Sequence, residues 1–277
     1  MKTNMKKIPY VLALLAVITS CAGSYNVQGS SSVSALDGSK LYLKAVKNNE
    51  LKNIDSCDVV HGQFHFNGVL DTVRMVNLFM DDESIMPVVL EAGEITIRID
   101  NASQKVGGTP LNDKLYEFID KHNQLDNQMN ELAHKQSQMM LDGIDEDEIN
   151  QKLSIEAAQI AKEEDKLVTS FIVDNFDNVL GPGVFMMITS GYQYPILTPQ
   201  IEDIMSKATD KFKSNPYVSE YYKIASENEA RMQGLEPDGT PTPTQAQPQE
   251  TIDSISAGQQ VNNSPFSQKV LTDSIKK

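Results

Sequence analysis

Between residues 40 and 108, hydrophobic and polar residues alternate with a period of two, which is the pattern of half-buried β-strands. Leu41 and Leu43 fall on one face of such a strand, and Lys40 and Lys44 fall on the other. Further strand-like runs cover residues 53–60, 63–67, 73–80, 85–90 and 94–99. Many short strands separated by turn dipeptides such as His61-Gly62 predict an antiparallel β-sandwich or a partly open barrel.

At Gly107-Gly108-Thr109-Pro110 the period changes, and apolar residues then recur every three or four positions. One such stripe runs from Leu115 to Met139, with His122 and Gln136 at its polar positions, and a second runs from Ile149 to Phe171, with Glu164 as its polar interruption. Asp145 can cap the second helix, and Glu148 completes a capping-box arrangement. The turn at Asp142-Gly143 therefore predicts a long antiparallel helical hairpin.

The rest of a helical region over residues 109–232 is predicted to consist of short helices. We expect the preceding helix to be broken at Leu180-Gly181-Pro182-Gly183 and a short buried helix to follow at 184–188. Thr198-Pro199 and Asn215-Pro216 each combine an N-cap residue with proline at the first helical position. Pro, Thr, Gln and Ser dominate residues 233–277, which predicts a disordered tail. The predicted fold class is α+β.

Lys2, Lys6 and Lys7 precede an apolar run, Ile8–Ile18. This run has about eleven residues, whereas a membrane-spanning helix needs roughly 20, so we interpret residues 1–20 as a signal peptide. Ile18-Thr19-Ser20-Cys21 resembles the lipobox of bacterial lipoproteins. The resemblance implies cleavage before Cys21 and acylation of Cys21, and several acyl chains would give a stable anchor. The alternative is an ordinary signal peptide that contains a cysteine, in which case cleavage releases a soluble protein.

Residues 21–39 are rich in Ser, Gly and Asn, and we expect a lipidated tether leading into a first strand near Tyr25–Gly29. Ala22, rather than Asp, follows Cys21, which by resemblance to sorting in enteric bacteria favours the outer membrane. No acidic run follows Cys21, and this favours a periplasm-facing position. The expected partners are the membrane, through lipid on Cys21, and a protein of the cell envelope.

The chain carries a formal net charge of −14, and removal of the three signal-peptide lysines would bring it to −17. A protein this acidic repels nucleic acid, and no basic patch suggests otherwise. Lipidation of Cys21 would leave Cys57 as the remaining cysteine, which excludes an intramolecular disulfide, and there is no Cys-x-x-Cys motif. Cys57 is either a reactive thiol or a small apolar strand residue, and we favour the strand residue.

Other candidate chemistry is weak, and we predict no catalytic, metal-binding or cofactor-binding residue. His61 and His65 straddle the turn expected at Gly62, so they make a poor metal pair. His122 forms a helical pair with Asp126, but its place in the hairpin seam favours an interior histidine that Glu164 can reach across the hairpin. The acidic stretch Asp142–Glu148 lacks the ligand spacing of a calcium loop. Met139-Met140 and Met186-Met187 are either adaptable binding surfaces or, as we favour, core residues.

Four motifs in order resemble a lipoprotein module known as domain of unknown function 4369: Ile54-Asp55-Ser56, Gly62–Gly68, Leu90-Glu91-Ala92-Gly93 and Gly108-Thr109-Pro110-Leu111-Asn112. The resemblance implies a β-sandwich followed by helices over residues 25–232. Such modules commonly precede a thioredoxin-like thiol–disulfide oxidoreductase domain. Where that domain would begin, this chain enters its Pro/Thr/Gln-rich tail, so no catalytic residue is carried over.

Three hypotheses of function follow from these observations. The first is a non-enzymatic envelope lipoprotein that binds a partner or plays a structural role, with any uncovered seam of the hairpin as its docking surface. The second is an accessory of envelope thiol–disulfide metabolism derived from a thioredoxin-domain lipoprotein. The third is an enzyme whose site has no recognisable motif, which a cleft lined by converging ionisable groups would indicate.

Overall fold

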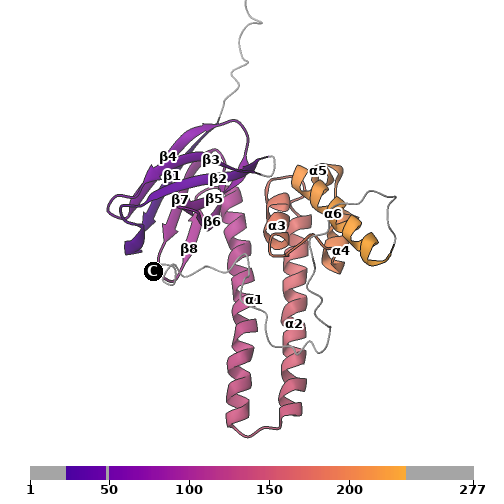
Figure 1. Ribbon diagram of the computed structural model, residues 1–277. Helices are drawn as coiled ribbons and strands as arrows, with labels where there is room; N and C mark the ends of the chain where they lie inside the picture. Colours follow the sequence, from indigo (N-terminus) through magenta and orange to yellow (C-terminus); the bar gives the residue numbers. More distant parts are fainter. Residues whose placement is uncertain (1–22, 48–49, 235–277) are drawn as a thin grey trace, which may run out of the picture.

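The computed structural model describes residues 23–47 and 50–234 and shows two packed β-sheets followed by helices (Figure 1). This architecture confirms the predicted α+β class and the sandwich, which is not a closed barrel. The predicted signal peptide, the lipidation site Cys21 and residues 235–277 of the predicted tail lie outside the described residues.

Within the described residues, each sheet of the sandwich has four strands. Sheet A has the order β4-β1-β7-β8 and sheet B the order β3-β2-β5-β6. The bounds are β1 Gly23–Ser31, β2 Lys40–Lys47, β3 Glu50–Asp58, β4 Gln63–Leu70, β5 Arg74–Met80, β6 Glu83–Leu90, β7 Gly93–Ile99 and β8 Gln104–Gly107. Neighbouring strands are antiparallel except β1 and β7, which are parallel. The alternating apolar residues pack between the sheets, and Val27, Leu43, Phe66 and Ile97 are all buried there.

The first strand expected near Tyr25–Gly29 is present as β1, but it is longer than expected, since it begins at Gly23 and ends at Ser31. It lies between β4 and β7, and its small residues have a packing role. A Cβ atom added to Gly29 would lie 2.0 Å from the ring of Phe64, its partner on β4, and one added to Gly68 would lie 2.5 Å from the hydroxyl of its partner Tyr25. The glycine content of this segment indicated a tether. In the structure, Gly29 and Gly68 instead allow an aromatic ring of the paired strand to pack closely against the backbone.

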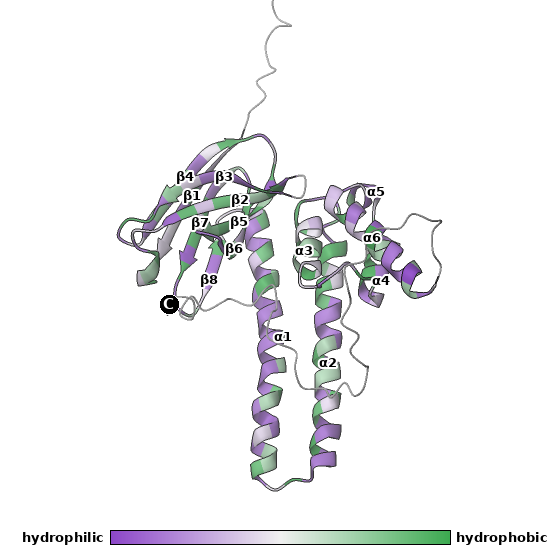
Figure 2. Cartoon of the chain, in the orientation of Figure 1, coloured by the Kyte–Doolittle hydropathy of each residue, from purple (hydrophilic) through white to green (hydrophobic). Residues whose placement is uncertain are grey.

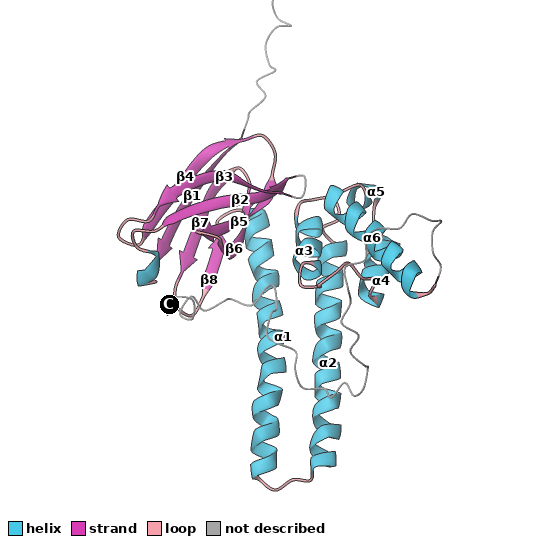
Figure 3. Cartoon of the chain, viewed as in Figure 1, coloured by secondary structure: helices cyan, strands magenta, loops and turns pink. Residues whose placement is uncertain are grey.

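Two long helices, α1 Pro110–Leu141 and α2 Glu146–Val173, form the predicted hairpin. In the part of the chain that the structure describes, four shorter helices follow: α3 Leu180–Thr189, α4 Pro199–Lys207, α5 Asp210–Lys213 and α6 Pro216–Met232. Figure 3 shows them grouped at the end of α2 that lies away from the hairpin turn. Hydrophobic residues gather where α1 meets the strands, whereas hydrophilic residues are common along the far half of the hairpin (Figure 2).

The three predicted helix starts are confirmed. The side chain of Asp145 accepts a hydrogen bond from Asp147 N, that of Thr198 from Ile201 N, and that of Asn215 from Tyr217 N and Val218 N. Each side chain thus satisfies a backbone donor that has no partner within its helix.

The predicted break at Leu180-Gly181-Pro182-Gly183 is wrong, because these residues form the first turn of α3. Helix α2 ends earlier, at Val173. Proline is tolerated in a first turn, where its missing N–H removes no helical hydrogen bond. A Cβ at Gly181 would lie 2.5 Å from the carbonyl oxygen of Asn175, so this glycine permits a close approach between the chain before α3 and the helix itself.

Candidate functional site

The N-terminus of α1 is fixed to the sandwich by a buried carboxylate. Glu91, which is 8% exposed, follows β6, and its Oε1 accepts hydrogen bonds from Leu111 N at 2.8 Å and Asn112 N at 3.1 Å. Pro110 has no N–H, and Asp113 N donates to the carbonyl of Thr109 at 2.9 Å. All the donors of the first turn are thereby satisfied, and the negative charge lies where the helix dipole stabilises it.

The side chain of Asn112 completes this junction by forming the hydrogen bonds that the backbone of a neighbouring strand would form. Its side chain is fully buried, and its Oδ1 accepts from Val89 N at 2.9 Å while its Nδ2 donates to Val89 O at 2.8 Å. The same Nδ2 lies 2.8 Å from Thr109 Oγ1. The amide therefore satisfies both backbone groups of Val89 on β6, the edge strand of sheet B, and closes that edge at this point.

The junction joins two of the four motifs that carried the family resemblance, Leu90-Glu91-Ala92-Gly93 and Gly108-Thr109-Pro110-Leu111-Asn112. Gly108 has φ +93°, and a Cβ there would lie 2.6 Å from the carbonyl oxygen of Glu94. Only glycine fits such a backbone at so close an approach. The motif residues are thus used to mount the hairpin on the sandwich.

From this junction α1 runs along the sandwich and then beyond it. Tyr116 Oη donates to the carbonyl of Pro87 at 3.0 Å, and Lys105 on β8 lies 3.5 Å from Asp120. Successive turns of α1 therefore contact progressively earlier residues of β6, and α1 also contacts β8. The remaining turns of α1 extend past the strands together with α2 (Figure 1).

The seam of the hairpin contains the predicted pairing of His122 with Glu164. Nε2 of His122 lies 3.0 Å from Glu164 Oε1, and the histidine is 3% exposed. Beside this pair the rings of Phe118 and Phe171 stack at a centroid distance of 4.3 Å. The interpretation of His122 as an interior histidine held by Glu164 is confirmed.

The seam is not left open as one continuous docking surface. Its two ends are buried, whereas Leu125, Met129 and Ile160 in the middle are only partly covered. At the hairpin turn, Met139, Ile149 and Leu153 form a small hydrophobic cluster separate from the main core. Next to it, Met140 and Leu141 are 59% and 83% exposed. Of the methionine pairs, Met139 is therefore a core residue and Met140 a surface residue, while Met186 and Met187 are partly buried.

A second candidate site lies where β3 and β4 separate into different sheets. His61 and Gly62, with φ +52° and +69°, form the two-residue turn between them, and Val60 and Gln63 exchange backbone hydrogen bonds of 2.9 and 3.0 Å. Positive φ at both turn positions is typical of a type I′ hairpin turn. Beyond this pair the strands diverge, and an open pocket of about 580 Å³ lies at the fork, lined by Gln28, Gly29, Cys57, Asp58, Val60, Gln63, Phe64 and His65.

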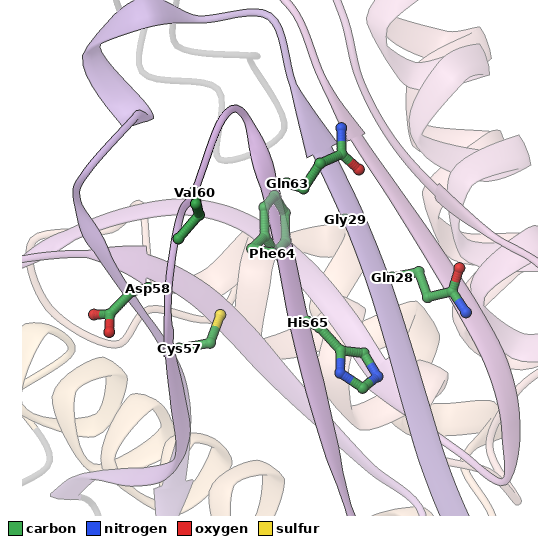
Figure 4. Close-up of a pocket in the computed structure, with 8 residues that line it drawn as sticks. All are labelled: Gln28, Gly29, Cys57, Asp58, Val60, Gln63, Phe64 and His65. Atoms are coloured by element: carbon green, nitrogen blue, oxygen red, sulfur yellow. The ribbon is translucent and has the colours of Figure 1, made fainter.

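Cys57 lies in this fork with its sulfur directed toward Phe64, whereas Asp58 and His65 point to different sides (Figure 4). Burial raises the pKa of the Cys57 thiol to about 11, although a hydrogen bond to the His65 backbone partly opposes the shift. A thiol with this pKa is protonated at neutral pH and is a poor nucleophile. The side chain packs against the main core, which agrees with a small apolar strand residue.

The histidines at 61 and 65 are not brought together as a metal pair. His61 is in the turn, and His65 Nε2 contacts Asn26 Oδ1 on the outer face of sheet A. There Asn26 Nδ2 donates to Glu94 Oε1 at 3.1 Å, which extends the polar row onto β7. In the described part of the chain, no group of three or more His, Cys, Asp or Glu side chains could hold a metal ion.

Of the helices within residues 23–47 and 50–234, none combines the length and the hydropathy that spanning a bilayer requires. The structure thus defines a two-layer β-sandwich with a helical hairpin mounted on it. Residues 25–115 match the family described as "Domain of unknown function (DUF4369)". The match spans the strands and the start of α1, so it includes Glu91 and Asn112 and confirms the domain part of the resemblance. No curated protein and no solved structure matches the chain.

Proposed function

We propose that this protein is a non-enzymatic, periplasm-facing lipoprotein of the outer membrane, anchored through acylated Cys21, and that it holds its helical hairpin out as a binding or structural element. The observation that carries the proposal is the set of hydrogen bonds through which Glu91 and Asn112 fix the hairpin to the sandwich. A long arm fixed by buried hydrogen bonds suits contact at a distance.

The hairpin turn supports the binding role. The cluster of Met139, Ile149 and Leu153 stabilises the end of the arm independently of the main core. Met140 and Leu141 then remain exposed on a locally ordered surface. Two adjacent exposed apolar side chains at the end of an arm provide apolar area that a partner can cover.

Anchoring is tested by mass spectrometry of the protein purified from membranes. The expected N-terminal residue is an acylated Cys21, and a Cys21→Ala variant should no longer partition into detergent. An unmodified N-terminus, or a chain that retains residues 1–20, would contradict the proposal.

The binding role is tested by photo-crosslinking in cells. A photoreactive amino acid replaces Leu141 in one strain and Lys223, whose side chain is 76% exposed on α6, in a matched strain. A discrete adduct at position 141 that is absent at position 223 supports a contact made by the end of the hairpin. The same pattern at both positions, or no adduct at 141, counts against it.

The alternative function, an accessory of envelope thiol–disulfide metabolism, would act through a partner protein rather than through Cys57. The raised pKa of Cys57 disfavours thiolate chemistry at this residue. A mixed disulfide trapped on Cys57 in cells would favour this alternative.

A further inference from the structure

The proposed anchor is only two residues before the sandwich in the sequence. Ala22 alone separates Cys21 from Gly23, where β1 begins. Two residues span at most roughly 7 Å, so the chain allows a lipid on Cys21 to be attached no farther than that from the first residue of β1. Gly23 pairs with Leu70 and Ser24 with Val69, which places the last residues of β4 beside the anchor.

This end of the sandwich exposes apolar side chains. Val69 is 76% exposed at the end of β4, and Val73 is 39% exposed in the connection to β5. Between them, Asp71 forms a salt bridge with Arg74, which offsets its charge. The two valines therefore lie at the end of the domain that the lipid holds.

We propose that this end of the sandwich, the anchored end, rests on the bilayer that holds the acyl chains of Cys21, with Val69 and Val73 in contact with the lipid interface. The inference rests on the proposed lipidation and adds to it a fixed orientation. Two valines are too few to bind a membrane alone. Beside a lipid anchor, which already holds the domain at the interface, they bury additional apolar area.

The same contact sets the direction of the hairpin. Gly93 at the start of β7 pairs with Tyr25 near the start of β1, and Glu91, two residues earlier, holds the N-terminus of α1. Helix α1 therefore begins at the anchored end and runs away from it, over about 46 Å at 1.5 Å per residue. The hairpin turn is then distant from the membrane surface. This placement avoids repulsion between negative lipids and the acidic residues of the turn, which are Asp142, Asp145, Glu146, Asp147 and Glu148.

The chain has no tryptophan, so single-tryptophan variants report on chosen positions. Val69→Trp tests the anchored end. Val60→Trp is the matched control, because Val60 is 59% exposed but lies beyond the opposite end of β4. Each lipidated variant is placed in phosphatidylcholine vesicles with and without brominated acyl chains, and flotation separates bound from unbound protein.

The expected result is that Val69→Trp emits at shorter wavelength on vesicles and loses intensity with brominated lipid, whereas Val60→Trp changes in neither respect. Protein that does not float would refute the proposed anchoring. Protein that floats while Val69→Trp is unquenched, or is quenched no more than Val60→Trp, would leave the anchor intact and overturn the orientation. A Val73→Trp variant gives a second reading of the anchored end in case position 69 does not tolerate the larger ring.

Discussion

Asn112 donates its backbone N–H to the buried carboxylate of Glu91 at 3.1 Å, and its side chain at the same time pairs with both backbone groups of Val89. One residue thus receives the helix cap and closes a sheet edge. The orientation of the hairpin relative to the sandwich depends on this relationship, because it links the end of β6 to the first turn of α1.

Removal of the Glu91 side chain should destabilise the protein. Glu91→Ala leaves the N–H groups of Leu111 and Asn112 without their acceptor, and we expect the free energy of unfolding to fall by about 2 kcal/mol. Glu91→Gln keeps one acceptor oxygen and should cost less. The control is Glu94→Ala, three residues away on the exposed face of sheet A, which should be nearly neutral in the same urea titration. Equal effects at the two positions would contradict the role of the cap.

The His122–Glu164 pair should show a modest coupling energy. Glu164 has a side chain that is 40% exposed, so solvent screens the interaction, and a double-mutant cycle of His122→Leu and Glu164→Leu should give about 1 kcal/mol. The doubly substituted chain should be nearly as stable as the original, because the seam then becomes apolar throughout. Strictly additive losses would show that the two side chains do not interact.

Sequence reasoning predicted the features whose partners are close in the chain or fixed by a period. The caps at Asp145, Thr198 and Asn215 bond to N–H groups two or three residues on, so a local pattern suffices. His122 and Glu164 were predicted to pair because both interrupt apolar stripes, and an antiparallel hairpin brings such positions face to face.

Features that depend on how distant segments meet were missed. Glu91 and Asn112 were noted only as parts of motifs, because nothing local shows that a carboxylate after β6 reaches a helix 20 residues later. Strand β1 was underestimated for the same reason: Gly29 is needed because of Phe64, which is distant in sequence. The fork at Cys57 could be recognised only once β3 and β4 were known to enter different sheets.

Gly29→Ala should be costly despite its small size. The added Cβ would lie 2.0 Å from the ring of Phe64, a rigid side chain that is 4% exposed, so the ring or β1 must move. We expect a loss of about 2 kcal/mol in the free energy of unfolding, in the range measured for overpacking. Gly191→Ala is the control, because the nearest atom to its added Cβ lies at 3.9 Å. Thermal unfolding measures both variants. If Gly29→Ala is as stable as the control, the ring of Phe64 can move away from residue 29 without a cost in stability.

Cys57 should react with alkylating reagents slowly at neutral pH and faster as the pH rises toward 11. Its pKa is raised from 9.0 to about 11, so the folded protein holds the thiol proton more firmly than the unfolded chain does. The resulting contribution to stability is complete below pH 9 and is lost as the pH rises from 9 toward 11.

The measurement is the iodoacetamide rate between pH 7 and 10 for a chain with Cys21→Ser, in which Cys57 is the remaining thiol, compared with the same chain in urea. The folded protein should show no plateau in this range, whereas the unfolded chain should begin to level near pH 9. A fast, pH-independent reaction of the folded protein would show a thiolate at neutral pH and would reopen a redox role for this residue.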